Sequence, residues 1–201
     1  VKQTLDAAGI EYQESQVAQN ALVITKGEII SSDLFKNGEI TIQDESAMLA
    51  VESMHIEPGD KVLDACAAPG GKSTHMAQYL TSGHITALDL YEHKLDLINQ
   101  NAERQHVADK ITTQKADATM IFEEFGSDKF DRILVDAPCS GIGLIRRKPD
   151  IRYRKESSDF VDLQKIQLEI LNSASKSLKK SGIMVYSTCT IFDEENFDVV
   201  R

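Results

Sequence analysis

Two of the three cysteines in the sequence stand in short segments where a thiol could act as a nucleophile. Cys139 lies in Asp-Ala-Pro-Cys-Ser-Gly at residues 136–141, and Cys189 lies in Ser-Thr-Cys-Thr at residues 187–190. Small polar residues flank both thiols, and the thiolate is the nucleophilic form of cysteine. Cys66 differs because an apolar stretch precedes it and two alanines follow it, so its own residues favour a small buried side chain.

The number and spacing of the cysteines exclude two other roles. The three positions lie far apart and form no local ligand pair, and no histidine stands near Cys139 or Cys189, so we expect no metal site. An odd number of widely spaced cysteines also excludes a disulfide framework. Free thiols suit a reducing cytosol, and we therefore expect a cytoplasmic protein.

An alternation of predicted strands and helices would position the two loops. We expect helices at 44–54, 72–80, 92–105 and 160–178, and strands at 61–64, 84–89, 111–115, 132–136 and 182–187. This alternation with short turns is typical of an α/β fold with a doubly wound, mostly parallel sheet. Ligands bind such a sheet beyond the carboxyl ends of its strands. Both cysteine loops and the acids Asp64, Asp89, Asp117 and Asp136 stand at those ends.

The first 43 residues have a different pattern. They carry few helix signals and two short β-branched pieces, at 21–25 and 39–42, separated by turn residues. Because such a piece is too short for its own core, we expect the end of an ancillary α+β subdomain at 1–43 and the α/β domain at 44–201. The chain begins at Val1 without methionine and stops inside an apparent helix, so we expect a C-terminally truncated fragment.

The turn after the first strand, at residues 64–72, allows two interpretations. Gly-Lys-Ser at 71–73 ends like the P-loop of a nucleoside triphosphatase. However, the first glycine of that pattern falls at Cys66, and Pro69 removes an amide that would bind phosphate. We favour a glycine turn whose backbone approaches an uncharged or zwitterionic ligand, with Asp89 positioned to bind ribose hydroxyls.

The overall composition is that of a globular protein. Apolar residues make up 41% and charged residues 27%, which argues against disorder and a coiled coil. No apolar run approaches the roughly 18–20 residues that cross a bilayer, and the first residues lack the apolar core of a secretory signal.

The net charge is −10, but one stretch departs from this balance. Six basic residues fall between positions 146 and 155, and the run is either a solvated loop or a phosphate-binding patch. These residues are Arg146, Arg147, Lys148, Arg152, Arg154 and Lys155.

Four motifs together resemble those of a known family. They are DACAAPGGK at 64–72, ALDL at 87–90, DAPCSG at 136–141 and YSTCT at 186–190. Over about residues 40–201 the sequence resembles the Nop/Sun family of RNA cytosine-5 methyltransferases, in particular the bacterial 16S ribosomal RNA enzymes of the Sun/Fmu type. The resemblance implies a Rossmann-like methyltransferase domain that transfers a methyl group from S-adenosylmethionine to carbon 5 of a cytosine in RNA.

The resemblance also implies a role for each motif residue. Asp89 would bind the ribose hydroxyls of the cofactor, Asp117 would lie on its adenine side, and Asp136 would lie between the cofactor and the target base. Cys189 would be the nucleophile and Cys139 would assist product release. The turn that wraps the methionine and ribose part would consist of Cys66, Ala67, Ala68, Pro69, Gly70, Gly71 and Lys72.

Covalent catalysis explains why this chemistry needs a thiol. Carbon 5 of cytosine is a poor nucleophile, but attack by a thiolate on carbon 6 gives carbon 5 enamine character. Asp136 would hydrogen-bond the ring, and Cys139 or a water beside it would help remove the proton from carbon 5.

The partner implied by the resemblance is ribosomal RNA. The target base must leave its stack, which favours a single-stranded or loop cytosine, and the run 146–155 would hold phosphates beside it. We expect a monomer without a membrane or metal partner. The alternatives are a P-loop-like nucleoside triphosphatase and a non-catalytic RNA-binding fragment.

Overall fold

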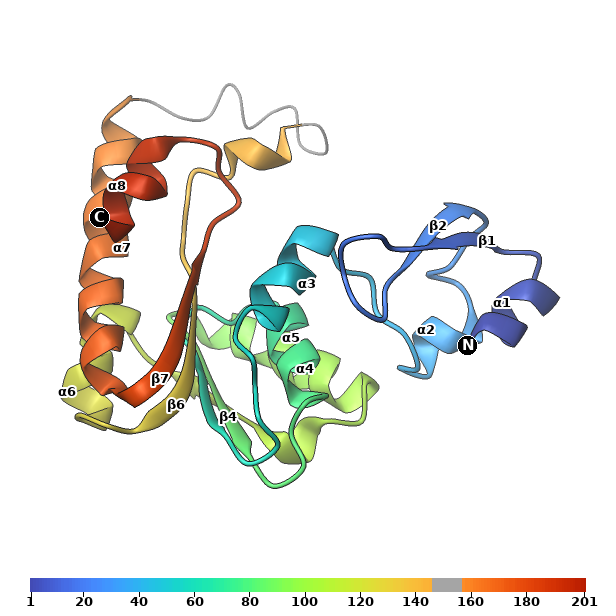
Figure 1. Cartoon of the computed structure of the whole chain (residues 1–201), viewed down its shortest axis with the longest axis horizontal. Helices are drawn as coiled ribbons and strands as arrows, with labels where there is room; N and C mark the ends of the chain where they lie inside the picture. The colour runs from blue at the N-terminus through green and yellow to red at the C-terminus, as the bar shows by residue number, and fades with distance from the viewer. Residues whose placement is uncertain (146–156) are drawn as a thin grey trace.

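The computed structural model of the chain describes residues 1–145 and 157–201 (Figure 1). Its central sheet is parallel, with the strand order β5-β4-β3-β6-β7. The strands are β3 (Lys61–Asp64), β4 (His84–Asp89), β5 (Ile111–Lys115), β6 (Phe130–Asp136) and β7 (Leu178–Ser187). The chain runs outward from β3 to β5 and then returns to the other side of β3 through β6. This confirms the predicted doubly wound sheet, whose switch point lies between β3 and β6.

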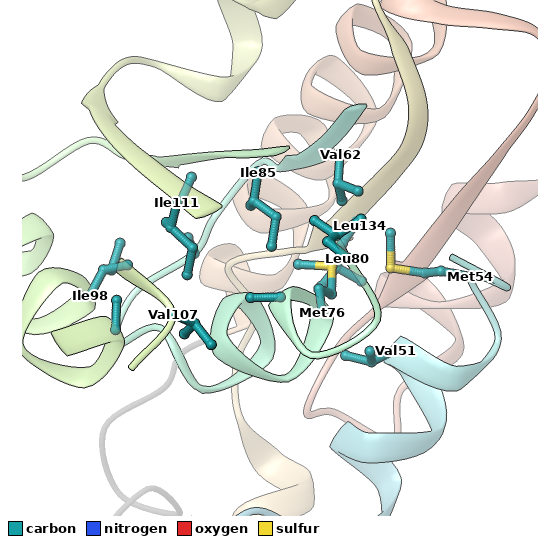
Figure 2. Packing of buried hydrophobic residues seen from close by; sticks show 14 of the residues in the cluster. Val51, Met54, Val62, Met76, Leu80, Ile85, Ile98, Val107, Ile111 and Leu134 are labelled. Atoms are coloured by element: carbon teal, nitrogen blue, oxygen red, sulfur yellow. The ribbon is translucent and has the colours of Figure 1, made fainter. Parts of the chain in front are cut away.

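Helices cover both faces of this sheet. One face carries α3 (Glu45–Glu52), α4 (Gly71–Ala77) and α5 (Glu92–Arg104), and the other carries α6 (Ile121–Phe125) and α7 (Ser157–Ser177). Side chains alternate along each strand, so Val62 packs toward the first set of helices and Leu63 toward the second. Figure 2 shows the first of these two cores, in which Met76 and Leu80 of the α4 region pack against strand side chains.

The strand predictions agree closely with the structure. The bounds of β3, β4 and β5 are the predicted ones, whereas β6 begins two residues earlier and β7 begins at Leu178 instead of Gly182. The first residues of β7 are half-buried or exposed, so the apolar pattern marked only the later part of the strand. Helix α6 was not predicted, because it is only one turn long.

The first 43 residues form a small unit with its own elements. They are α1 (Lys2–Ala7), β1 (Glu11–Glu14), β2 (Leu22–Lys26) and α2 (Asp33–Lys36), with β1 and β2 antiparallel. The piece contains both helices and strands although its sequence carries few helix signals, and residues 39–42 form no strand. The amides of Glu39 and Ile40 instead donate to the carbonyl of Leu34 and complete the end of α2.

Arg104 of α5 joins this N-terminal unit to the sheet domain. Its Nη1 donates to the carbonyl oxygens of Phe35 (2.8 Å) and Ile40 (3.2 Å), and its guanidinium lies 4.3 Å from the centre of the Phe35 ring. A Cβ on Gly38 would lie 1.6 Å from the carbonyl oxygen of Arg104. The contact therefore requires glycine at position 38.

That residues 1–43 form the end of a larger subdomain stays a prediction.

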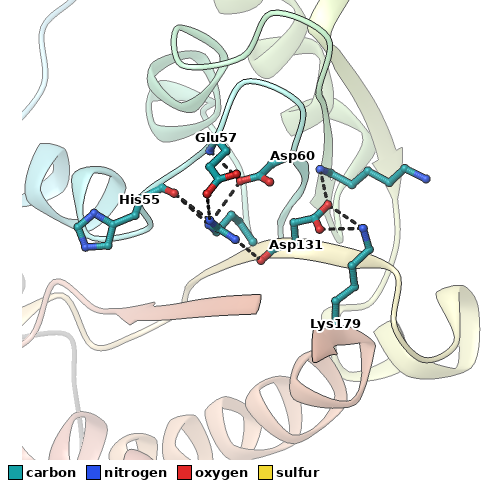
Figure 3. Close-up of polar contacts among 7 residues, drawn as sticks. His55, Glu57, Asp60, Asp131 and Lys179 are labelled. Carbon is teal, nitrogen blue, oxygen red and sulfur yellow. Dashed lines mark hydrogen bonds and ion pairs between the residues drawn. The ribbon is translucent and has the colours of Figure 1, made fainter. Parts of the chain in front are cut away.

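A charged network joins β6 to its neighbours away from the carboxyl ends of the strands (Figure 3). Arg132 is only 9% exposed, and its Nε lies 3.4 Å from Asp60 Oδ2 and donates to the carbonyl oxygen of His55. Asp131 accepts from Lys179 Nζ at 2.8 Å. Because the buried guanidinium is paired and hydrogen-bonded, we interpret this network as structural.

Candidate active site

The carboxyl ends of β6 and β7 bring a carboxylate and a hydroxyl together. Asp136 and Ser187 are partners in the strand register, and Ser187 Oγ donates to Asp136 Oδ1 at 2.7 Å. Lys72, in the first turn of α4, donates from Nζ to Asp136 Oδ2 at 2.7 Å. Both oxygens of Asp136 are therefore held. The sequence placed Lys72 in the cofactor turn and gave no sign that it would pair with Asp136.

The two thiols, both expected at the carboxyl ends of the strands, lie next to each other. The Sγ atoms of Cys139 and Cys189 are 3.1 Å apart, and the backbone amide of Cys189 donates to Cys139 Sγ at 3.2 Å. Cys189 is exposed, whereas Cys139 is half-buried. Cys189 is therefore the more accessible of the two thiols, and Cys139 lies in contact with it.

The contact between the thiols separates their acidities. The hydrogen bond from Cys139 stabilises the Cys189 thiolate and lowers the pKa of Cys189 to about 7, and Lys72 acts in the same direction while Asp136 opposes it. The same hydrogen bond, together with burial, raises the pKa of Cys139. A cysteine that ionises near neutral pH is the better nucleophile of the pair. The electrostatics thus select Cys189 for attack and leave Cys139 protonated.

Close packing fixes the Cys189 loop against the Cys139 loop. Ser140 Oγ donates to Thr190 Oγ1 at 2.9 Å, and the amide of Gly143 donates to the carbonyl oxygen of Cys189 at 3.0 Å. A Cβ on Gly143 would lie 2.9 Å from that oxygen, which is closer than real Cβ contacts. Gly143 therefore permits the close approach of the two loops.

The glycine turn lies between the ends of β3 and β4. Gly70 caps α4 with a φ of 102°, and a Cβ there would lie 2.9 Å from Ile98 Cα, so both the backbone and the space require glycine. A Cβ on Gly71 would meet nothing within 4 Å. The backbone of this turn is therefore open at Gly71 to an approaching ligand.

The two acids expected to bind the cofactor differ in burial. Asp89 is buried, and its Oδ1 accepts from the amide of Tyr91 at 3.0 Å and lies 3.7 Å from Lys94 Nζ. Both of these contacts use Oδ1. Asp117 is exposed and accepts from Thr119 through its Oδ1.

The sequence analysis placed Asp64 at a strand end but did not predict that its carboxyl group would be buried. It is 1% exposed at the end of β3, and Ser73 Oγ donates to its Oδ2 at 2.6 Å. Burial raises the pKa of Asp64 to about 7, although the bond from Ser73 lowers it. An acid at the end of an apolar strand was the only signal in the sequence. Cys66, expected as a small buried side chain, is half-buried against the second core, and burial raises the pKa of its thiol.

Three further expectations concern the basic run, metal binding and membrane spans. The basic run 146–155 lies outside the described residues. Within residues 1–145 and 157–201, no group of three or more His, Cys, Asp or Glu side chains could hold a metal ion. Of the helices in this described part, none has both the length and the apolar character to cross a membrane.

A family model described as 16S rRNA methyltransferase RsmB/F matches residues 51–201. The chain belongs to this family. The probable ribosomal RNA small subunit methyltransferase B of Bacillus subtilis is 46% identical over 97% of the chain. The matched region makes up 44% of that relative, so the chain spans less than half of its length. These matches confirm the resemblance to the Sun-type enzymes.

Solved structures agree with the family. A methyltransferase homolog from Pyrococcus horikoshii matches 99% of the chain and 63% of its own, with a TM-score of 0.87 and 32% identity. NSun6 from Pyrococcus horikoshii, solved with SFG, matches 90% of the chain and 47% of its own, with a TM-score of 0.79 and 30% identity. These similarities confirm the Rossmann-like methyltransferase fold and give no support to the P-loop alternative.

Proposed function

We propose that the protein containing this chain transfers a methyl group from S-adenosylmethionine to carbon 5 of a cytosine in 16S ribosomal RNA. Membership of the RsmB/F family supports the reaction and the RNA. The observation that carries the proposal is the pair of thiols 3.1 Å apart, beside the carboxylate that Lys72 and Ser187 hold. Cytosine C5 chemistry needs a nucleophile and a group that helps to release it, and this pair supplies both.

The glycine turn and its acids fit S-adenosylmethionine. When bound, the cofactor supplies an electrophilic methyl group on a positively charged sulfur. Gly71 leaves the backbone open, and Asp89 is positioned to accept hydrogen bonds from ribose hydroxyls. We assign Cys66 through Lys72 to the methionine and ribose part and Asp117 to the adenine side. These carboxylates also favour a cationic ligand over a triphosphate.

Cys189 begins the reaction in this proposal. Its thiolate bonds to carbon 6 of the cytosine, and the ring electrons that this attack displaces make carbon 5 nucleophilic. Asp136 is held through both oxygens, so it meets the polar edge of the base without reorganising. After methylation a water beside Cys139 takes the proton from carbon 5, the electrons of that bond restore the double bond between carbons 5 and 6, and Cys189 leaves carbon 6 as a thiolate.

The RNA substrate must present an unpaired base. A cytosine inside a helix cannot reach Cys189 without leaving its stack, so we propose a single-stranded or loop target. We assign phosphate binding to the basic run 146–155. The free thiols and the ribosomal RNA substrate of the family favour a cytoplasmic location.

Labelled methyl transfer by the full-length protein tests the proposal. Wild type should methylate 16S ribosomal RNA at one cytosine, and Cys189→Ala should lose transfer while retaining cofactor binding. Cys139→Ala should accumulate a covalent protein–RNA adduct that survives denaturing gels. Ser173→Ala is the control, because Ser173 lies on α7 and bonds to the amide of Phe122. An active Cys189→Ala protein, or RNA binding without any cofactor binding, would overturn the proposal.

A further inference from the structure

Two fully buried polar residues hold the peptide groups on both sides of Cys139. Glu195, at the end of the short helix η5 (Asp193–Glu195), and Gln167 of α7 are both 0% exposed. Glu195 Oε2 accepts from the amide of Ser140 at 2.8 Å. Gln167 Nε2 donates to the carbonyl oxygen of Pro138 at 2.9 Å and to Glu195 Oε2 at 3.0 Å. The residue before Cys139 and the residue after it are thus bound to one pair of side chains.

Glu195 also connects the Cys139 loop to the Cys189 loop. Glu195 follows Cys189 by six positions, and Tyr186, just before the Cys189 loop, donates from its hydroxyl to the Glu195 carbonyl oxygen at 2.8 Å. The Glu195 side chain then reaches Ser140. Two loops that are fifty residues apart in the sequence therefore share one buried anchor.

Packing alone does not explain these side chains. Burying a carboxylate costs free energy that an apolar side chain of similar size would avoid. In the described part of the chain, Glu195 Oε1 and Gln167 Oε1 are buried without a hydrogen-bond partner, so the burial is only partly compensated. What the pair does achieve is to fix the backbone around a reactive thiol.

We propose that Glu195 and Gln167 are positioning residues that hold the Cys139 thiol against Cys189. Without them the Ser140 amide loses its acceptor, the loop can relax, and the hydrogen bond between the thiols weakens. The catalytic consequence, slower product release, rests on the proposed function. The weakening of the hydrogen bond between the thiols does not rest on it, because this contact can be measured without RNA or cofactor.

The experiment is alkylation of Cys189 by iodoacetamide as a function of pH in the full-length protein, with the modified peptide quantified by mass spectrometry. Two charged side chains that act on the Cys189 thiol, Asp136 and Lys72, are unchanged in every variant, and Gln167→Met removes no charge at all. Wild type should give a midpoint near pH 7. Glu195→Leu and Gln167→Met should raise the midpoint by about one pH unit or more, because the thiolate loses its donor.

Two variants separate positioning from general damage. Glu195→Gln keeps an acceptor oxygen for the Ser140 amide and should keep the midpoint close to that of wild type. Ser173→Ala removes a different hydrogen bond of α7 and should also leave the midpoint unchanged. Melting temperatures identify any variant that does not fold, and Gln167→Met then decides the question in place of Glu195→Leu.

A double variant tests whether Glu195 acts through Cys139. Cys139→Ala alone should raise the midpoint of Cys189, and adding Glu195→Leu should give no further shift. A further shift in the double variant, or an unchanged midpoint in folded Glu195→Leu and Gln167→Met, would overturn the inference. Because alkylation needs no substrate, failure of methyl transfer by wild type would refute the proposed function and leave this result intact.

Discussion

The free energy of unfolding of Asp64→Asn, compared with that of wild type, should increase as the pH rises. Asp64 lies at the end of β3, is 1% exposed, and has a pKa raised to about 7 by burial from an ordinary value of 3.8. The folded state therefore holds the proton more tightly than the unfolded state does. The resulting stabilisation is complete below about pH 4 and is lost as the pH rises through about 7.

The magnitude follows from the size of this shift. A difference of about three pH units corresponds to about 4 kcal/mol at 1.36 kcal/mol per unit, and roughly 2.5 kcal/mol of it falls between pH 5 and pH 8. Asp64→Asn does not titrate, so its free energy of unfolding lacks this loss. The buried amide of the variant also changes the free energy of unfolding, but by the same amount at every pH. It therefore does not affect how the difference between variant and wild type changes with pH.

Urea unfolding at pH 5, 6, 7 and 8 measures the effect. The free energy of unfolding of Asp64→Asn minus that of wild type should increase steadily across this range, because the other titrating groups cancel in the difference. Ser73→Ala should move the transition to higher pH, since Ser73 donates the bond that lowers the pKa of Asp64. A difference that stays constant from pH 5 to pH 8 would refute the reasoning.

Three further predictions concern the site and the N-terminal unit. Single-turnover methyl transfer should increase with pH through a midpoint near 7 as Cys189 ionises, and a flat profile from pH 6 to pH 8 would contradict this assignment. Gly143→Ala should lower methyl transfer at least about tenfold, because its Cβ would lie 2.9 Å from the carbonyl oxygen of Cys189. Circular dichroism should show that this variant keeps its secondary structure, and full activity would show that the loop tolerates the contact. Arg104→Met should lower the free energy of unfolding by about 1–3 kcal/mol through the lost bonds to Phe35 and Ile40. It should also speed proteolysis within residues 1–43, and a cleavage rate equal to that of wild type would argue against the role of Arg104.

The sheet and the meeting of the thiols could be predicted because both follow from chain order. Buried parallel strands appear as short apolar runs, and β3, β4 and β5 match their predicted bounds. The carboxyl ends of such strands meet at one edge, so residues after β6 and β7 had to be close. The 3.1 Å contact between Cys139 and Cys189 is the detailed form of that expectation.

The side chains that hold the site could not be predicted in the same way. Glu195 ends an acidic run, Asp193-Glu194-Glu195, which looks like an exposed helix start, yet tertiary packing buries it completely. The partners of Gln167 and Lys72 lie far away in the sequence, and no local pattern identifies them. In the N-terminal unit the elements are short, so the amides of residues 39 and 40 could serve either a strand or the end of α2.

The short distance between the two sulfurs should also make this pair of thiols open to oxidation. A disulfide has a sulfur–sulfur bond of about 2 Å, so the thiols of Cys139 and Cys189 would need to approach by only about 1 Å to form one. A peroxide could take one hydrogen from each thiol, leaving a disulfide and water. Such a bridge would block Cys189, and a thiol reductant in the assay buffer should restore its reactivity.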